Sequence, residues 1–177
     1  AYGLSKAKGM EIARDFRDRL NIFCATAICF NHDSCFSPNE HLARLVPRKL
    51  SLAKRQRKFP VKFFNVGIVR DFSHASDFAA AFQLLLEHHV PLDLVVASGK
   101  PTTLKAYIET GCHLLVIDPL TSIVYETVDD KNSYDRIANP SRLFNELGYR
   151  PRYTASKICR EMLWWEAQSI RATMNKS

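Results

Sequence analysis

The chain alternates between segments in which apolar residues recur at helical spacing and short runs that are apolar throughout. The spacing over Ser5 to Leu20 and over Ser76 to His89 predicts two helices. Ile22 to Phe30 and Asp93 to Ala97 are continuous apolar runs of strand length, the kind that is buried on both faces of a sheet. Because helices separate the strands, the pattern predicts a parallel sheet and the α/β class.

Local signals predict the elements in the middle of the chain. Glu40 to Lys58 predicts a strongly basic helix that Pro47 kinks or interrupts, and its charges are expected to form a solvated face. Val61 to Phe64 predicts a short strand. Thr103 to Thr110 predicts a helix with Thr102 as its cap.

The last third of the chain is less regular. Cys112 to Val128 is compatible both with strands and with an extended loop. Asn139 as a cap, Pro140 in the first turn and Gly148 as a stop signal predict a short helix. A final helix is expected from Ala155 to Met174.

Composition narrows the class of protein. With 177 residues, 46% hydrophobic and 24% charged, the chain is long enough for one domain with a core. No apolar stretch approaches the ~20 residues of a membrane span, so we expect no membrane partner. Five cysteines without a CxxC pair or zinc-type spacing predict no metal site and a cytoplasmic protein. The net charge of +7 favours anions such as nucleotides, but Arg48 to Lys58 lacks the interleaved aromatic residues of a nucleic-acid site.

A Y-x-x-x-K motif places two reactive groups on one face of the first helix. Tyr2 and Lys6 are four residues apart, and an ammonium beside a phenol favours the phenolate, which makes proton transfer possible. Tyr153 and Lys157 have the same spacing. We favour the first pair because its helix leads into an apolar run that ends in the polar residues 31–34, where α/β sheets bind ligands.

Several blocks, in order along nearly the whole chain, resemble the extended short-chain dehydrogenase/reductase family. They are most similar to its GDP-mannose 4,6-dehydratase branch. The blocks are Tyr2-x-x-x-Lys6, the run ending in Asn31-His32-Asp33-Ser34, Arg70 to Phe78, Asp93 to Gly99, and Asn139 to Pro151. The resemblance implies the carboxyl-terminal part of a Rossmann-type parallel sheet plus a small α/β substrate-binding subdomain, interleaved over residues 1–177.

The same resemblance implies that the amino-terminal dinucleotide-binding half is absent. The six glycines are scattered and form no G-x-G-x-x-G loop, and the first residue is Ala. We therefore expect a fragment that lacks the cofactor's phosphate loop, the catalytic Thr or Ser, and the glutamate that takes a proton from C5.

The resemblance also implies roles for single residues. Tyr2 would be the catalytic proton-transfer residue at the sugar's C4 hydroxyl, and Lys6 its activator. Both would contact the cofactor NADP, Lys6 at the nicotinamide ribose, and His32 would contact it as well.

Three further residues are implied to bind the substrate. Asn31 would face the nucleotide diphosphate, and Arg70 would pair with the phosphates or ribose, a task that suits a guanidinium. Lys49 matches a lysine of the branch that lies near the substrate.

Other stretches depart from the branch. Ser34 to Glu40 lacks the two arginines of its S-P-R-R-G-E stretch, and Thr26-Ala27 replaces Asn-Gly. For the arginine of its R-P-A-E segment, only 130–132 or Arg136 are counterparts. The base and the sugar of the substrate therefore stay open. The oligomeric state stays open as well, and a homo-oligomer is possible.

The resemblance implies an NADP-dependent nucleotide-sugar 4,6-dehydratase, a lyase of the type that converts GDP-mannose to GDP-4-keto-6-deoxymannose. As a fragment it is expected to be inactive alone. One alternative is a nucleotide-sugar epimerase or reductase of the same fold, which lacks the eliminating glutamate. The other is a non-catalytic remnant that binds nucleotides.

Overall fold

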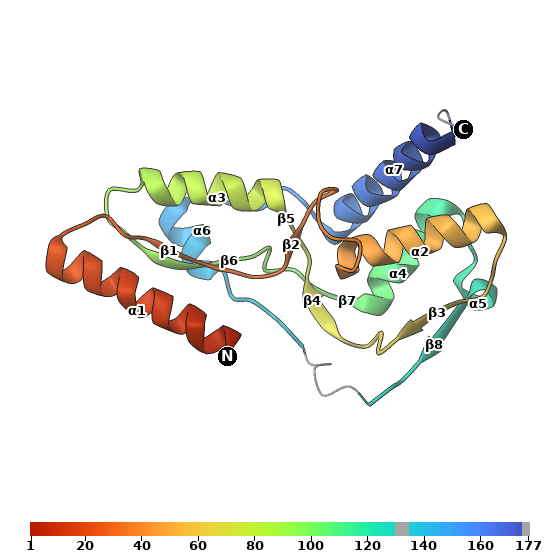
Figure 1. The fold of residues 1–177 in the computed structure, drawn as a ribbon, viewed down its shortest axis with the longest axis horizontal. Helices are drawn as coiled ribbons and strands as arrows, with labels where there is room; N and C mark the ends of the chain where they lie inside the picture. The colour runs from red at the N-terminus through yellow and green to blue at the C-terminus, as the bar shows by residue number, and fades with distance from the viewer. Residues whose placement is uncertain (130–134, 175–177) are drawn as a thin grey trace.

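The computed structural model describes residues 1–129 and 135–174, which form an elongated molecule with two lobes (Figure 1). Its helices are α1 (Tyr2–Leu20), α2 (Leu42–Gln56), α3 (Ala75–Glu87), α4 (Leu104–Leu115), α5 (Pro119–Ser122), α6 (Ser141–Leu147) and α7 (Ala155–Met174). Its strands are β1 (Thr26–Cys29), β2 (His32–Asp33), β3 (Val61–Phe64), β4 (Val69–Asp71), β5 (Ser73–His74), β6 (Asp93–Val96), β7 (Pro101–Thr103) and β8 (Ile123–Glu126).

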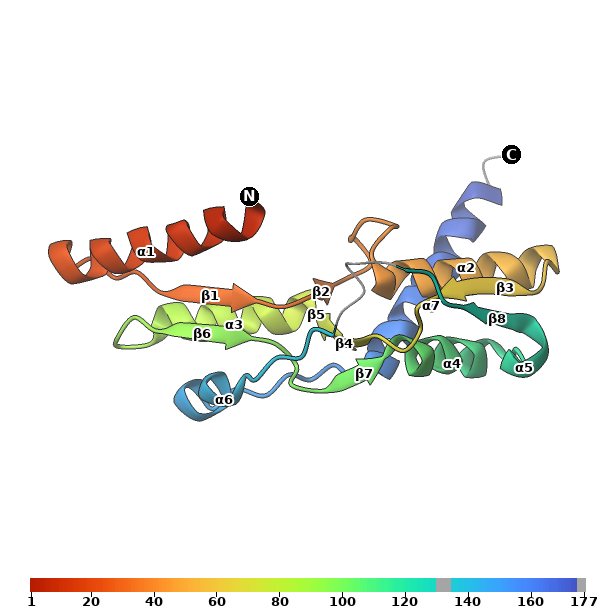
Figure 2. The same cartoon turned by 90° about the horizontal axis from the view of Figure 1, so that it is seen from below.

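The first lobe is built on the parallel pair of β1 and β6, in register from Thr26 opposite Asp93 to Cys29 opposite Val96. Helix α3 lies behind the pair in Figure 2, α1 lies alongside β1, and α6 lies alongside β6. Apolar side chains of α3, β6 and α6, including the fully buried Leu94, form the core of this lobe. The parallel pairing and the flanking helices confirm the predicted α/β class.

The expected burial of residues 22–30 on both faces is wrong for this chain. No residue of α1 is buried, Ile22 and Phe23 are 46% and 43% exposed, and Cys29 in β1 is exposed. Among the described residues, β1 pairs only with β6. A hollow of about 660 Å³, named here the edge hollow, separates α1 from β1 and is lined by residues of both. The strand is therefore half-covered because α1 does not close over it.

The second lobe packs α2, α4 and α7 around a larger core. It also carries the parallel pair of β3 and β8 and the antiparallel pair of β4 and β7. The short parallel pair of β2 and β5 lies where the two lobes meet (Figure 1). No helix in the described part of the chain has both the length and the apolar character needed to cross a membrane.

Pro47 lies inside α2, and the helix continues past it. Of the two expected outcomes, a kink or an interruption, the interruption is wrong. A proline has no N–H, so the carbonyl of Ala43, four residues earlier, loses its helical donor. The hydroxyl of Tyr107 in α4 donates to that carbonyl oxygen at 2.9 Å. Tyr107 is fully buried, and burial raises the pKa of its phenol well above the usual value, so the hydroxyl stays protonated as a donor.

Other local predictions are corrected in detail. The cap of α4 is Thr103, the last residue of β7, whose hydroxyl accepts from the Ala106 N–H at 3.1 Å. The predicted cap Thr102 instead donates its hydroxyl to the Lys100 carbonyl. The ambiguous segment from 112 to 128 contains the end of α4, the short α5 and β8. Gly148 ends α6 with a φ of 61°, as predicted.

Candidate functional site

A hollow of about 510 Å³ lies at the carboxyl end of β1, between the two lobes, and is named here the central hollow. The polar and ionisable side chains that line it are Tyr2, Asn31, His32, Asp33, His41, Arg70 and Arg136. They come from the start of α1, the residues from β1 to β2, the residue before α2, strand β4, and the segment before α6. Four of the six predicted site residues are thereby brought together.

Tyr2 and Lys6 lie side by side on the first turns of α1. The Lys6 Nζ is 5.3 Å from the centre of the Tyr2 ring, as the helical spacing predicts. Lys6 lines the edge hollow, and Tyr2 lines both hollows, so the pair stands where the two openings meet. Both side chains are exposed, which leaves the phenol accessible to a reactant.

Asn31 and His32 leave the end of β1 toward the central hollow. The His32 ring stacks on Phe78 of α3, with ring centres 4.2 Å apart. Its Nδ1 is 2.9 Å from the carbonyl oxygen of Phe30, and a carbonyl only accepts, so Nδ1 carries the hydrogen. The stacking and this bond hold the ring and leave Nε2 as an acceptor.

Arg70 is almost fully buried in β4, at 6% exposure, and yet lines the central hollow. Its Nη1 donates to the carbonyl of Val69 at 2.9 Å. Arg136, which the sequence offered only as a counterpart of a family arginine, forms a β-bridge with Arg70. The N–H of Arg136 donates to the same Val69 carbonyl at 3.1 Å. Two guanidinium groups therefore line one hollow, which suits an anion with several oxygens. The other counterpart, residues 130–132, lies outside the described residues.

A buried carboxylate next to Arg70 ties the site to the first lobe. Asp71, at 2% exposure, accepts hydrogen bonds from the Ser73 hydroxyl at 2.7 Å and from the N–H groups of Ser98 and Gly99 at 2.9 and 2.8 Å. Gly99 has a φ of 69°, and a side chain there would meet Pro140 at 2.9 Å. The turn after β6 is thus held against β4.

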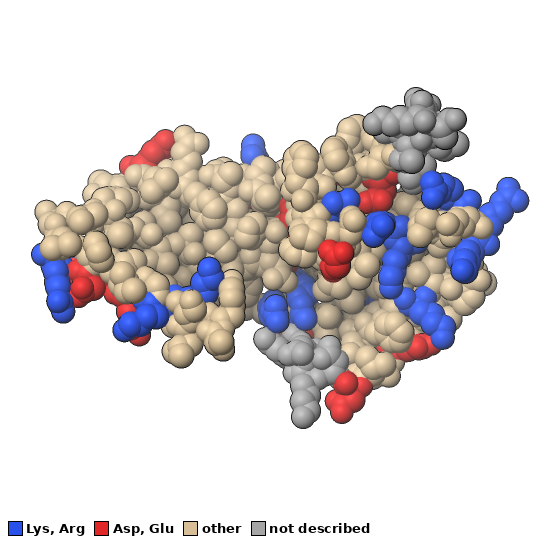
Figure 3. Space-filling model, in the orientation of Figure 1, with Lys and Arg blue, Asp and Glu red and all other residues tan. Residues whose placement is uncertain are grey.

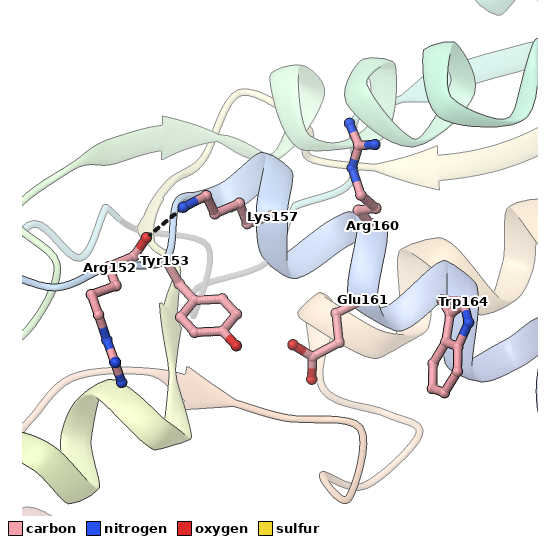
Figure 4. A pocket seen from close by; sticks show the side chains of 6 residues that line it. All are labelled: Arg152, Tyr153, Lys157, Arg160, Glu161 and Trp164. Carbon is pink, nitrogen blue, oxygen red and sulfur yellow. Dashed lines mark hydrogen bonds between the residues drawn. The ribbon is translucent and has the colours of Figure 1, made fainter.

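The second Y-x-x-x-K copy is used for packing at the start of α7. The Tyr153 ring stacks on His74 with centres 3.9 Å apart, and the Lys157 Nζ donates to the carbonyl of Arg152 at 3.1 Å. Figure 4 shows both residues beside a separate hollow of about 620 Å³ along α7. This hollow is also lined by Arg152, Arg160 and Glu161, and the preference for Tyr2 over Tyr153 stays a prediction.

The order of the sequence blocks, the parallel strands with flanking helices and the polar lining of the central hollow all agree with the family that the sequence resembles. The family model for GDP-mannose 4,6 dehydratase matches residues 1–162. The chain belongs to this family.

Relatives in the family cover nearly the whole chain. GDP-mannose 4,6 dehydratase 2 of Caenorhabditis elegans is 24% identical over 184 residues, 92% of this chain and 47% of its own length. GDP-mannose 4,6 dehydratase of Homo sapiens is 24% identical over 193 residues, 98% of this chain and 52% of its own. The chain thus spans about half the length of these relatives.

Solved structures share the fold. RMD from Pseudomonas aeruginosa in complex with NADPH has a TM-score of 0.82 at 19% identity, covering 94% of this chain and 56% of that one. The dTDP-glucose 4,6-dehydratase of Bacillus anthracis in complex with NAD has a TM-score of 0.79 at 21% identity, covering 97% and 53%. These matches confirm the expected Rossmann-type architecture.

Lys49 is the predicted substrate residue that stands apart. It lies on α2 with its Nζ 5.4 Å from the centre of the Phe63 ring, and it does not line the central hollow in the described structure. The basic residues around it are exposed, and Lys and Arg side chains gather over this end of the molecule (Figure 3). The predicted solvated face of α2 is confirmed, and the substrate role of Lys49 stays a prediction.

His41 and Asp33 line the central hollow, and sequence reasoning assigned a role to neither. His41 immediately precedes α2, and its Nδ1 is 2.8 Å from the Asp33 carboxylate. The only local signal is a histidine at the start of an amphipathic helix, which by itself does not indicate a ligand. Its contact with Asp33 joins residues that are eight positions apart in the sequence.

Proposed function

We propose that this chain supplies the substrate-binding part and the Tyr–Lys pair of a nucleotide-sugar 4,6-dehydratase that acts on GDP-mannose with NADP. The observation that carries the proposal is the central hollow, where Tyr2, Asn31, His32 and Arg70 converge from segments far apart in the sequence. Relatives named GDP-mannose 4,6 dehydratase match the chain over most of its length, which supports this substrate.

The hollow has the chemistry of a nucleotide-sugar site. Guanidinium groups such as those of Arg70 and Arg136 pair well with phosphate oxygens, and the Asn31 amide can donate to them too. Tyr2 lines the same hollow, so a sugar attached to that diphosphate would meet the phenol. A diphosphate anchor and a proton-transfer group within one hollow are what a 4,6-dehydratase requires of this half.

In the proposed reaction Tyr2 takes the proton of the C4 hydroxyl, and the Lys6 ammonium favours the phenolate that does so. A nicotinamide dinucleotide bound beside Tyr2 and Lys6 would supply the hydride chemistry, oxidation at C4 and reduction at C6. Oxidation at C4 acidifies the C5 hydrogen, so water is lost across C5 and C6. The product keeps the ketone at C4, so the proton that Tyr2 takes does not return to that oxygen. It passes to solvent and balances the hydroxide that leaves C6 in the released water.

The residues present fit one end of that cofactor. Tyr2 lines both hollows, Lys6 lines the edge hollow and His32 lines the central hollow, and these three residues would hold the nicotinamide ribose end. A glycine-rich loop for the pyrophosphate does not occur in these 177 residues. We therefore propose that residues 1–177 alone bind the nucleotide sugar and release no keto product.

A second candidate is a nucleotide-sugar epimerase or reductase, which also uses a Tyr–Lys pair. The UDP-glucose 4-epimerase of Thermotoga maritima in complex with UDP-glucose has a TM-score of 0.79 at 14% identity, so the same fold serves both chemistries. A non-catalytic nucleotide-binding remnant is the remaining alternative.

The proposed cytoplasmic location is supported by the cysteines. All five, at positions 24, 29, 35, 112 and 159, are free thiols, as expected in a reducing compartment. A homo-oligomer stays a prediction.

Calorimetric titration of the 177-residue chain with GDP-mannose, dTDP-glucose and UDP-glucose tests the proposal. We expect GDP-mannose to bind most tightly and Arg70→Lys to weaken it about tenfold, because lysine cannot form the paired bonds of a guanidinium. Arg48→Lys is the matched control, since Arg48 is exposed on α2 and does not line the central hollow.

The outcomes separate the candidates. Preference for UDP-glucose would favour the epimerase. Equal binding of all three sugars would favour the remnant, and equal effects of the two arginine substitutions would contradict the site. Release of keto product by the chain with NADP would refute its proposed inactivity.

A further inference from the structure

A histidine and a buried carboxylate form a pair on the wall of the central hollow. The His41 Nδ1 lies 2.8 Å from the Asp33 Oδ1. The Asp33 side chain is 10% exposed and that of His41 is 52% exposed, and both residues line the hollow with Arg70 and Arg136. The carboxylate is thus largely buried behind an imidazole that faces the open space.

The pair fixes the chemistry of the ring. Because a carboxylate accepts, the Nδ1 of His41 carries a hydrogen and donates it to Asp33. The Nε2 atom is then an acceptor in the neutral ring and a donor in the protonated ring. None of the described side chains forms a hydrogen bond with Nε2, and the exposure of His41 leaves that edge of the ring accessible.

Helix capping does not account for this arrangement. His41 precedes the first turn of α2, but no side chain caps that helix. Its ring is turned to Asp33 on β2 instead of to its own helix. The contact therefore orients the imidazole relative to the hollow.

The charges around the ring favour an anionic ligand. The ionisable side chains that line the hollow with His41 are Tyr2 from α1, His32 and Asp33 from β2, Arg70 from β4, and Arg136. On α2 itself, Arg44 is turned away to Glu166 of α7 at 3.1 Å and to the Ser37 carbonyl. Asp33 is the one carboxylate among the described lining residues, and it is bonded to His41.

We propose, on the basis of the proposed function, that His41 binds the diphosphate of the nucleotide sugar as a protonated imidazolium, with Asp33 as its positioning residue. A phosphate beside Nε2 favours the charged ring, and Nε2–H then donates to a phosphate oxygen. Arg70 and Arg136 supply the other two cations. Binding of a nucleoside diphosphate therefore takes up a proton.

The test is calorimetric titration of the 177-residue chain with GDP near neutral pH, in two buffers that differ in ionisation enthalpy. The difference in heat gives the number of protons taken up. We expect wild type to take up a fraction of a proton. His41→Gln should bind GDP about tenfold more weakly and lose the uptake. Asp33→Asn should weaken binding and reduce the uptake, because the ring loses its charged partner.

Two further variants make the result specific. His113→Gln, in the last turn of α4 and away from the hollow, is the matched histidine control and should keep both affinity and uptake. His32→Gln identifies which histidine of the hollow is protonated. Thermal unfolding of each variant verifies that the fold is retained.

The possible outcomes distinguish failure of the proposed role of His41 from failure of the proposed function. If His41→Gln keeps wild-type affinity and uptake while Arg70→Lys weakens GDP binding, the role of His41 is refuted and the proposed function stands. Loss of the uptake in His32→Gln but not in His41→Gln refutes it as well. If wild type binds neither GDP nor GDP-mannose, the proposed function fails and this inference with it.

Discussion

At the scale of single residues, a carboxylate at the start of β6 joins this strand to α1. The Asp93 carboxylate accepts from Arg14 Nε at 2.8 Å and from Arg17 Nη1 at 3.2 Å. Burial opposes its ionised form, but hydrogen bonds from Arg17 and Arg14 outweigh burial and lower the pKa of Asp93 to about 2, from an ordinary 3.8. These bonds hold the helix that carries Tyr2 and Lys6.

The lowered pKa predicts a pH dependence of stability. A carboxyl group whose pKa is lower when folded stabilises the fold fully above its unfolded pKa, and this contribution is lost on acidification. We expect it to disappear as the pH falls from about 4 to about 2. Urea unfolding at several pH values should show this dependence in wild type and not in Asp93→Asn.

Asp18→Asn is the control for that experiment. The Asp18 side chain is 73% exposed and lies 3.7 Å from Arg17, so its contribution is screened by solvent. It should keep the wild-type dependence between about pH 4 and pH 2. An identical loss of dependence in both variants would mean that Asp93 has no special role.

At the scale of elements, helix α2 depends on a neighbouring helix for one of its hydrogen bonds. Pro47 removes the donor for the Ala43 carbonyl, and Tyr107 of α4 replaces it. The helix that carries His41 at its start is thereby fastened to the core of the second lobe. A proline that would weaken an isolated helix is tolerated because a tertiary contact satisfies the carbonyl.

A double-mutant cycle tests whether the Tyr107 hydroxyl replaces the backbone N–H donor that Pro47 lacks. Tyr107→Phe should lower the free energy of unfolding by about 1–3 kcal/mol, because it leaves the buried Ala43 carbonyl without a donor. In a Pro47→Ala background the helix regains its own N–H donor, so the same substitution should cost clearly less. Chemical denaturation of the four proteins gives both costs, and equal costs would show that Tyr107 does not compensate for Pro47.

At the scale of the whole molecule, burial is distributed unevenly. One core lies among α2, α4 and α7, and a second lies among α3, β6 and α6, whereas α1 contributes no buried residue. Apolar residues of α1, among them Phe16 at 45%, are exposed. The sheet of the first lobe is therefore stabilised from one face only.

This asymmetry predicts opposite results for two similar substitutions on the two faces. Leu94→Ala should cost about 2–5 kcal/mol, because Leu94 is fully buried between β6 and its helices. Phe16→Ala should change the free energy of unfolding by less than about 0.5 kcal/mol, since its side chain is exposed. Urea denaturation measures both, and a large cost for Phe16→Ala would mean that α1 is packed against the sheet.

The sequence alone determined most elements and their order, because these depend on signals within a few neighbouring residues. Val61–Phe64 and Ala155–Met174 have the predicted bounds, and Gly148 ends its helix as expected. The Tyr2–Lys6 pair was equally predictable, since helical spacing alone places both side chains on one face.

Only the tertiary structure decided what depends on contacts between distant segments. It brought Arg136 beside Arg70 and His41 onto Asp33, and it placed Lys49 against Phe63 instead of in the central hollow. It also left one face of β1 open. The sequence could not predict this, because an apolar run does not specify which neighbouring element covers it. Pairing and packing are set by topology, and the spacing of residues along a chain does not encode them.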